Sequence, residues 1–329
     1  MIEVCELVKE FRVARHHRGL VGSLRNLVET RSEVVRAVDG VSFRIADGEF
    51  VGFVGPNGAG KSTTIKMLTG VLEPTSGSLA VDGLHPRRDR IAHTRRIGVV
   101  FGQRTQLWWD LPVIESYELL RRVYAVESRA WRTQLERLAE LLGVGPLLDV
   151  PVRKLSLGQR MRCELGAALL HAPRLLFLDE PTIGLDVVAK EAIRSFLARE
   201  NREQGTTILL TTHDLPDVER LCPRMILIDH GRVVHDGAVE AIRRRLGSER
   251  VLRVDFEGPA PRELPDGVVE EERGPERLVL RFERDRIPSA RLVEWLSERC
   301  PIADLSLEEP PIERIVAEIY RRGLPPGDG

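Results

Sequence analysis

The chain of 329 residues lacks any apolar run near the roughly 18 residues that a membrane-spanning helix needs. Its longest apolar stretches, such as Leu175–Leu178, suit single buried strands. The cysteines at positions 5, 163, 222 and 300 lack the spacing of metal ligands, so packed, reduced thiols are expected. The start, MIEVCELVKEF, has acidic residues and no long apolar core, unlike a secretory signal. We therefore expect a cytoplasmic chain that does not span a membrane.

A large excess of charge is also missing, because 49 Lys and Arg residues face 50 Asp and Glu residues, a net charge of −1. A generic nucleic-acid binder normally carries a basic excess, so no nucleic-acid partner is expected. The balance conceals an asymmetry. Residues 12–36 contain six arginines and two glutamates, whereas residues 241–329 contain 16 basic and 19 acidic side chains. A basic N-terminal segment thus precedes an acidic C-terminal region.

The length predicts two domains, or one large domain with an appendage. Over residues 1–240, short apolar runs alternate with helix-compatible segments, a pattern typical of a sheet wrapped by helices. Residues 112–172 contain apolar-periodic segments without a strand-like run, which predicts a helical insertion. The strands expected in this first domain are residues 50–54, 97–101, 175–178, 206–210 and 225–228.

The composition changes after Gly237, and residues 241–329 are predicted to form a small α+β domain. The segment Gly258–Gly274 is rich in Gly, Pro and charge, which indicates a domain junction. The elements expected in this region are strands at 251–256, 278–282 and 302–307 and helices at 288–299 and 311–322.

A phosphate-binding loop is predicted at GPNGAGKS, which fits the pattern G-x-x-x-x-G-K-[ST] between an expected strand and an expected helix. In such a loop, backbone N–H groups surround the phosphate oxygens, the lysine reaches the β- and γ-phosphates, and the hydroxyl ligates Mg²⁺. A glycine-rich turn with an incidental lysine is the alternative, and the flanking elements disfavour it. The nucleotide-binding residues expected here are Gly55, Pro56, Asn57, Gly58, Ala59, Gly60, Lys61, Ser62 and Thr63.

Two carboxylates follow the apolar run Leu175–Leu178 and are expected at the carboxyl end of a buried strand, where open α/β sheets bind ligands. Asp179 would hold Mg²⁺, and Glu180 would orient or deprotonate the water that attacks the γ-phosphate. A core strand with a polar end is the alternative. The phosphate-binding loop makes that alternative the weaker one.

The segment KLSLGQR at residues 154–160 lies just before this strand and resembles the LSGGQ signature of the ATP-binding-cassette (ABC) ATPases. Leu157 stands where that motif has its first glycine, and Ser156, Gly158 and Gln159 match it. The resemblance covers roughly residues 1–240. It implies an α/β fold of the P-loop NTPase type with a helical subdomain, and an ATPase that uses ATP and Mg²⁺.

Further residues match the motifs of the family in the expected order. The resemblance implies that Gln103 contacts Mg²⁺ and the attacking water, that Asp186 belongs to the D-loop at the dimer contact, and that His213 contacts the γ-phosphate. Phe11 is the candidate for stacking on adenine, and a buried core aromatic is the alternative for it.

The resemblance also implies partners. In the family, the signature of one subunit closes over ATP held by the loop of another, so we expect a homodimer. ABC subunits of this kind energise a separate membrane permease, and the sequence most resembles bacterial drug and antibiotic exporters. We therefore expect a peripheral location on the cytoplasmic face of the membrane. The C-terminal domain would be an accessory or regulatory domain.

Two segments are candidate contacts with the permease or the bilayer. Trp108 and Trp109 would anchor a permease helix, or else belong to the core of the helical subdomain. Residues 16–31 have a basic amphipathic pattern and would lie at the membrane interface, or else form a solvated surface helix.

Other classes of ATPase carry the same motifs. A chromosome-maintenance ATPase is excluded, because only 95 residues separate Lys61 from Ser156 and leave no room for a long coiled coil. Translation factors of the superfamily normally carry two cassettes, and this chain has one. An ATP-dependent dimerisation switch without transport stays open as an alternative.

Overall fold

The computed structural model describes residues 1–14, 32–102, 104–246, 249–309 and 311–322. Contacts divide the chain into two compact units, Met1–Asp236 and Gly237–Gly329. The first unit contains two sheets and the second unit contains one, and each unit has its own buried core. In the described residues, no helix is long and apolar enough to cross a bilayer.

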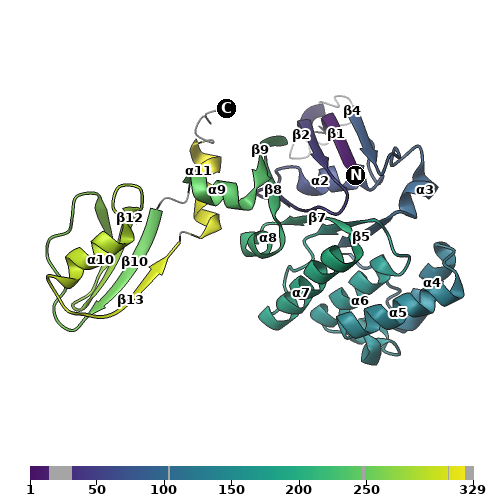
Figure 1. Ribbon diagram of the computed structural model, residues 1–329. Coiled ribbons are helices and arrows are strands. Elements are labelled where there is room, and N and C mark those ends of the chain that lie inside the picture. Colours follow the sequence, from purple (N-terminus) through teal and green to yellow (C-terminus); the bar gives the residue numbers. More distant parts are fainter. Residues whose placement is uncertain (15–31, 103, 247–248, 310, 323–329) are drawn as a thin grey trace, which may run out of the picture. The chain divides into compact units, whose positions relative to one another are not determined.

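A six-stranded sheet in the order β5-β6-β7-β3-β8-β9 forms the centre of the first unit (Figure 1). The pairs β5·β6, β6·β7, β7·β3 and β3·β8 are all parallel. Every residue of β3 and β7 is buried, as expected for strands covered on both faces. This architecture confirms the α/β prediction. The strands are β3 Phe50–Val54, β5 Ile97–Phe101, β6 Leu175–Asp179, β7 Thr207–Thr212, β8 Arg224–Asp229 and β9 Arg232–Ala238.

A second sheet of the first unit is antiparallel, with the order β2-β1-β4. Its strands are β1 Ile2–Ala14, β2 Ser32–Ile45 and β4 Ser76–Val81. Helix α2, Lys61–Leu68, lies between the two sheets, because its buried Ile65 and Leu68 share one core with Ile2 of β1 and Phe53 of β3. The helix that follows the phosphate-binding loop is therefore held from both sides.

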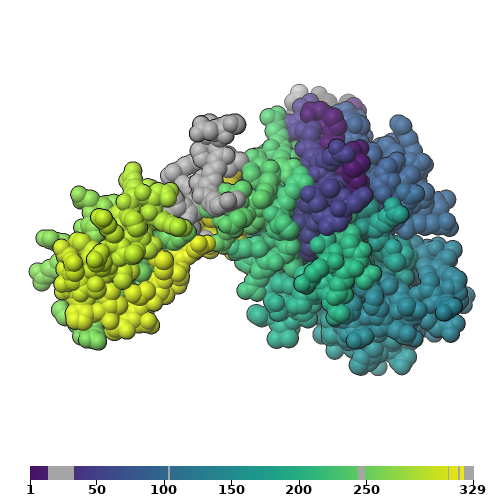
Figure 2. All heavy atoms as spheres, viewed as in Figure 1, coloured from purple at the N-terminus to yellow at the C-terminus, as the bar shows by residue number. Residues whose placement is uncertain are grey.

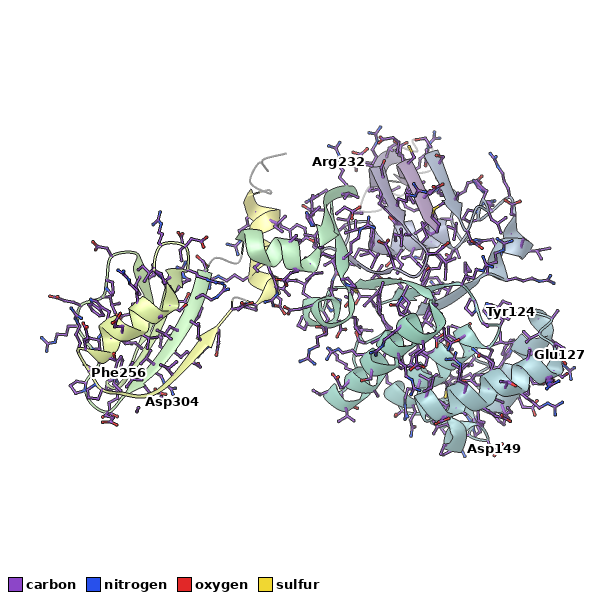
Figure 3. All side chains as sticks on the ribbon, in the orientation of Figure 1. Tyr124, Glu127, Asp149, Arg232, Phe256 and Asp304 are labelled. Carbon is purple, nitrogen blue, oxygen red and sulfur yellow. The ribbon has the colours of Figure 1, made fainter. Side chains whose placement is uncertain are left out.

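The stretch between β5 and β6 is mostly helical. It contains α4 Val113–Val123, α5 Ser128–Leu142 and α6 Leu157–Leu169. The Tyr117 hydroxyl of α4 donates to the Cys163 carbonyl of α6 at 2.8 Å, and a Cβ at Gly166 would lie 2.3 Å from that hydroxyl. Tyr124 and Glu127 flank the turn from α4 to α5 (Figure 3), where the Glu127 carboxylate caps α5. Close packing thus fixes α4 to α6.

Three further helices lie in the part of the first unit that the structure describes. Helices α7 Val187–Gln204 and α8 Leu215–Leu221 follow β6 and β7, as crossover helices do in a parallel sheet, and the short α3 spans Arg90–Thr94. The fully buried Asp217 of α8 accepts from Thr182 at 2.6 Å and pairs with Arg194 of α7. The loop after β6 is thereby tied to both helices.

The second unit contains a four-stranded antiparallel sheet in the order β11-β12-β10-β13. The heavy atoms of this unit are the light-green to yellow spheres in Figure 2. Helix α10, Ser289–Ser297, packs Leu292 and Leu296 on one face of this sheet, against a core that includes Phe256, labelled in Figure 3. The other elements are β10 Glu249–Phe256, β11 Val268–Arg273, β12 Arg277–Glu283, β13 Ile302–Glu308, α9 Val239–Leu246 and α11 Ile312–Arg322.

The prediction of a domain junction at Gly258–Gly274 is wrong. This segment lies inside the second unit, and its last part is β11, which pairs with β12 from Val268↔Phe282 onward. The charges that suggested a linker belong to an edge strand, where Glu270, Glu271 and Glu272 remain accessible to solvent and to arginines.

Candidate functional site

A cleft of about 660 Å³ opens at the carboxyl ends of the central parallel strands. Register explains why these ends converge, because Val54 lies beside Thr212, and Asp179 lies between Phe101 and Thr211. The lining comes from the glycine-rich loop, α2 and the loops after β5, β6 and β7: Ala37, Asn57, Gly58, Gly60, Lys61, Ser62, Thr63, Lys66, Val71, Phe101, Gly102, Arg104, Asp179, Glu180, Ile183 and His213.

Two glycines of the loop from Gly55 to Gly60 lie where any side chain would clash with the backbone of another strand. At Gly60, φ is +107° and an added Cβ would lie 2.4 Å from the Ala37 carbonyl oxygen. A Cβ at Gly55 would lie 2.3 Å from the Ile228 carbonyl oxygen. These glycines let the loop fold tightly against β2 and β8 and leave the N-terminus of α2 directed into the cleft, where an anion is favoured.

Lys61 is the first residue of α2 and is 6% exposed. Its Nζ donates to the carbonyl oxygens of Gly55 at 2.6 Å and Pro56 at 3.2 Å, so the ammonium is held across the loop. Burial lowers the pKa of the Lys61 ammonium, and the carboxylates of Glu180 and Asp179 partly oppose this shift. A buried cation beside backbone donors is suited to bind phosphate oxygens.

An all-oxygen cluster lies beside the lysine. The Ser62 hydroxyl donates to Asp179 Oδ1 at 3.1 Å, and the Thr211 hydroxyl donates to the same oxygen at 2.6 Å. A carboxylate and a hydroxyl are the hard oxygen ligands that Mg²⁺ accepts, with nucleotide phosphates supplying further ligands. In the described residues, no group of three or more His, Cys, Asp or Glu side chains could hold a metal ion alone. The donor set therefore fits a magnesium ion that arrives with its nucleotide.

Glu180 and His213 face each other at the mouth of the cleft. Glu180 Oε2 lies 2.6 Å from His213 Nδ1, and both side chains line the cleft. Glu180 follows the last residue of β6 with φ of +57°, a conformation that few residues other than glycine adopt. Its backbone N–H donates to the Thr211 carbonyl at 2.9 Å, and a Cβ at Gly102 would lie 2.2 Å from its carbonyl oxygen. The surrounding backbone thus holds the carboxylate at the end of the strand.

The signature segment forms the beginning of α6. Ser156 is the N-cap, its hydroxyl accepts from the Gln159 backbone N–H at 3.2 Å, and its own N–H donates to Gln159 Oε1 at 2.9 Å. This is a capping box. Gly158 packs on α7, where an added Cβ would lie 3.0 Å from the Ala189 Cβ. Asp186 caps α7 by accepting from the Ala189 N–H at 2.8 Å.

Comparison with known proteins decides the family. The protein-family model described as "ABC transporter" matches residues 38–183. The ABC transporter ATP-binding protein NatA of Bacillus subtilis (strain 168) is 34% identical over 67% of this chain and 89% of its own length. The chain belongs to the ATP-binding subunits of ABC transporters. As a member of this family it is an ATPase.

Other ABC relatives cover similar portions of the chain. The Nod factor export ATP-binding protein I of Burkholderia pseudomallei (strain 1710b) is 40% identical over 73% of this chain and 77% of its own. A solved ATP-binding subunit of an ABC transporter superposes with a TM-score of 0.61, at 27% identity over 74% of this chain and 92% of its own. A solved dimeric ATP-binding cassette in a post-hydrolysis state, with ADP and Pi bound, superposes with a TM-score of 0.60. It is 26% identical over 73% of this chain and 99% of its own.

The ABC cleft gathers only part of the residue set that the sequence suggested. Asn57, Gly58, Gly60, Lys61, Ser62, Thr63, Asp179, Glu180 and His213 all line it. Within the described chain, the lining does not include Phe11 or the loop residues Gly55, Pro56 and Ala59. Ser156, Gly158, Gln159 and Asp186 also lie outside it, and they were expected to act at the nucleotide of another subunit or at the dimer contact. Phe11 lies on β1 opposite Val35, half exposed, with Lys9 Nζ 5.3 Å from its ring centre. The predictions for Gln103 and for the basic amphipathic segment at residues 16–31 lie outside the described residues.

Several residues of the ABC site were not anticipated, and three of them have polar or charged side chains. Lys66 and Arg104 add positive charge to the lining, and Thr211 shares Asp179 with Ser62. The sequence held signals for two of them. Lys66 lies in the last turn of the short helix that follows the loop. Thr211 is the penultimate residue of β7 and lies beside Asp179, which parallel pairing of the two strands would have indicated.

Proposed function

We propose that this subunit drives an ABC exporter by ATP-dependent closure of a homodimer, coupled to a separate membrane permease. The position of the signature segment carries the proposal. Ser156 caps a helix outside the cleft of its own chain, although a complete ABC site needs a signature beside the nucleotide. A second copy related by a two-fold axis would supply it at both sites at once. The dimeric cassettes among the structural relatives support this arrangement.

An apolar patch beside the signature supports contact with a second copy. Val187 and Val188 at the start of α7 are each 79% exposed, and Leu157 is 37% exposed. The three are neighbours on one surface, because an added Cβ at Gly184 would lie 3.1 Å from Leu157 Cδ2 and Gly158 packs on Ala189. Clustered exposed apolar side chains favour a protein interface.

Replacing Val187 and Val188 together by aspartate is expected to weaken ATP-dependent dimerisation about 10- to 100-fold, because two charges would be buried at the interface. Light scattering with ATP measures the dimer, and equilibrium dialysis at low protein concentration measures nucleotide binding by the monomer. Aspartate at Val123 of α4, which is 69% exposed, is the control and should leave the dimer intact. If the double variant dimerises as the parent does, this patch does not belong to the dimer interface.

The reaction assigned to the cleft is attack of water on the γ-phosphate of ATP. Lys61 and the loop N–H groups would hold the phosphates, and Ser62 and Asp179 would hold Mg²⁺, which supplies charge neutralisation when bound. Glu180 would accept the proton of the attacking water. His213, at 2.6 Å from Glu180, would orient that carboxylate and contact the γ-phosphate.

Coupling to a permease is proposed through the loop before α4. Trp108 and Trp109 are half exposed, and the Arg160 guanidinium lies 5.5 Å from the Trp109 ring centre. Exposed tryptophans are favoured anchors at interfaces. Export is supported by the names of relatives, which include a Nod factor export protein and the linearmycin resistance protein LnrL of Bacillus subtilis (strain 168), 29% identical over 87% of this chain and 94% of its own. The subunit would then sit on the cytoplasmic face of the membrane.

One experiment distinguishes a transporter subunit from an ATP-dependent dimerisation switch without transport. The tagged full-length chain is purified from detergent-solubilised membranes, and any membrane protein in the eluate is identified by mass spectrometry. Co-purification that is lost when Trp108 and Trp109 are both replaced by alanine supports the transporter. A chain that stays free of membrane protein, but still forms a dimer with ATP, supports the dimerisation switch instead.

A further inference from the structure

One carboxylate of the first unit is buried outside the nucleotide cleft, on the helix that begins with the signature. Glu164 lies two turns into α6 and is 3% exposed. The Thr105 hydroxyl donates to its Oε1, and the Gln106 backbone N–H donates to its Oε2 at 3.2 Å. Gln106 Nε2 also donates to the Glu164 carbonyl at 3.2 Å. A single residue thus bonds α6 to the loop after β5, through both its side chain and its backbone.

The partners of Glu164 are unusual for a buried carboxylate. In the described chain, the hydrogen-bond donors to this residue come from Thr105, Gln106 and Leu107. By contrast, the equally buried Glu200 of α7 pairs with the Arg137 guanidinium at 2.8 Å. A carboxylate that is held by loop donors, with no cation among them, depends on that loop for its stability in the interior. Movement of this loop therefore strongly favours movement of Glu164 and of α6.

The same loop reaches the nucleotide cleft at its other end. Gly102 and Arg104 line the cleft, and the Gly102 N–H donates to the Asp179 carbonyl at 2.8 Å. Thr105 follows Arg104 directly, so one short segment has the cleft at one end and Glu164 at the other. On the far side of Glu164, α6 leads back to its cap at Ser156. A continuous physical connection thus runs from the cleft to the signature segment.

We propose that Glu164 is a positioning residue, which makes the signature helix follow the loop at residues 104–107 when nucleotide enters the cleft. The inference rests on the proposed ATP-driven closure and adds a route to it. ATP bound in the cleft of one copy would change the position of that copy's own signature segment through Glu164. This signature segment in turn faces the ATP that the second copy holds. The nucleotide in one site would thereby influence assembly of the second site.

The test compares the full-length parent with the variants Glu164→Gln and Thr105→Val, which weaken the connection from opposite ends. Glu200→Gln is the matched control, because it removes an equally buried carboxylate away from the loop. Hydrogen–deuterium exchange is followed at residues 104–108 and 156–165, with and without Mg²⁺ and a non-hydrolysable ATP analogue. The melting temperature and the steady-state ATPase rate are measured on the same samples.

In the parent, both segments should gain protection when the analogue is added. In Glu164→Gln and Thr105→Val, residues 104–108 should keep that gain while residues 156–165 lose most of theirs, and the ATPase rate should fall about 5- to 50-fold. The control should lower the melting temperature without separating the two segments. A purely stabilising role of Glu164 would not produce that separation.

Two results would overturn the role of Glu164 while leaving the proposed closure intact. If both segments respond in Glu164→Gln and Thr105→Val as they do in the parent, Glu164 does not transmit the signal. If Glu200→Gln separates the segments equally, the effect belongs to general loss of stability. A parent that shows no nucleotide-dependent dimer and no protection at 156–165 would instead refute the proposed closure, and the inference with it.

Discussion

Replacing Glu180 with glutamine is expected to lower the ATPase rate by about 10²- to 10⁴-fold while ATP binding stays within about threefold of the parent. Glutamine keeps the size of the side chain and an oxygen that can face His213, but it cannot accept the proton of the attacking water. Because binding persists without hydrolysis, the closed dimer should accumulate. Phosphate release measures the rate, and light scattering with ATP measures the dimer.

The matched control for this variant is Glu180→Asp, which keeps a carboxylate at the same backbone position. Aspartate tolerates the left-handed conformation found there, with φ of +57°, so the loop should keep its shape. The shorter side chain withdraws the base from the cleft, and the rate should fall less than in the glutamine variant. A glutamine variant that hydrolyses ATP at the parent rate would show that Glu180 is not the base.

The strands that form the cleft could be predicted from the sequence because they are short, uniformly apolar and followed by polar residues. Burial on both faces selects such runs in a parallel sheet, so the run at residues 175–178 indicated β6 and placed two carboxylates at its end. The phosphate-binding loop could be predicted for a related reason. Its glycines are required by close backbone approaches, such as that of Gly60 to Ala37, which leave a fixed spacing in the sequence.

Features that depend on two distant segments could not be predicted in this way. The bond between Thr105 and Glu164 joins residues 59 positions apart, and neither residue is unusual in its local pattern. The edge strand β11 was missed because its accessible charges resemble those of a linker. Ser156 and Gln159 were expected at the nucleotide of a second subunit, and the structure of one chain shows only the capping box that they form at the start of α6.

Replacing Lys61 with alanine is expected to weaken ATP binding at least about 100-fold, or about 2.7 kcal/mol, because charge-assisted hydrogen bonds to the phosphates are lost. The change also leaves the carbonyl oxygens of Gly55 and Pro56 without their ammonium donor, so some loss of stability is expected. The measurement therefore has to separate affinity from folding. The rise in melting temperature on adding ATP does this, since the stabilisation by a ligand depends on its free concentration relative to its Kd for the folded protein.

Lys66→Ala is the matched control, because Lys66 lies on the same helix and lines the same cleft. Lys61 occupies the first position of α2, where its Nζ bridges the loop, whereas Lys66 lies more than a turn further on and contributes mainly through longer-range attraction. We expect the control to keep most of the ATP-dependent rise in melting temperature, and Lys61→Ala to lose it. Equal losses in the two variants would mean that the cleft binds nucleotide through its net positive charge, and would remove the specific role given to Lys61.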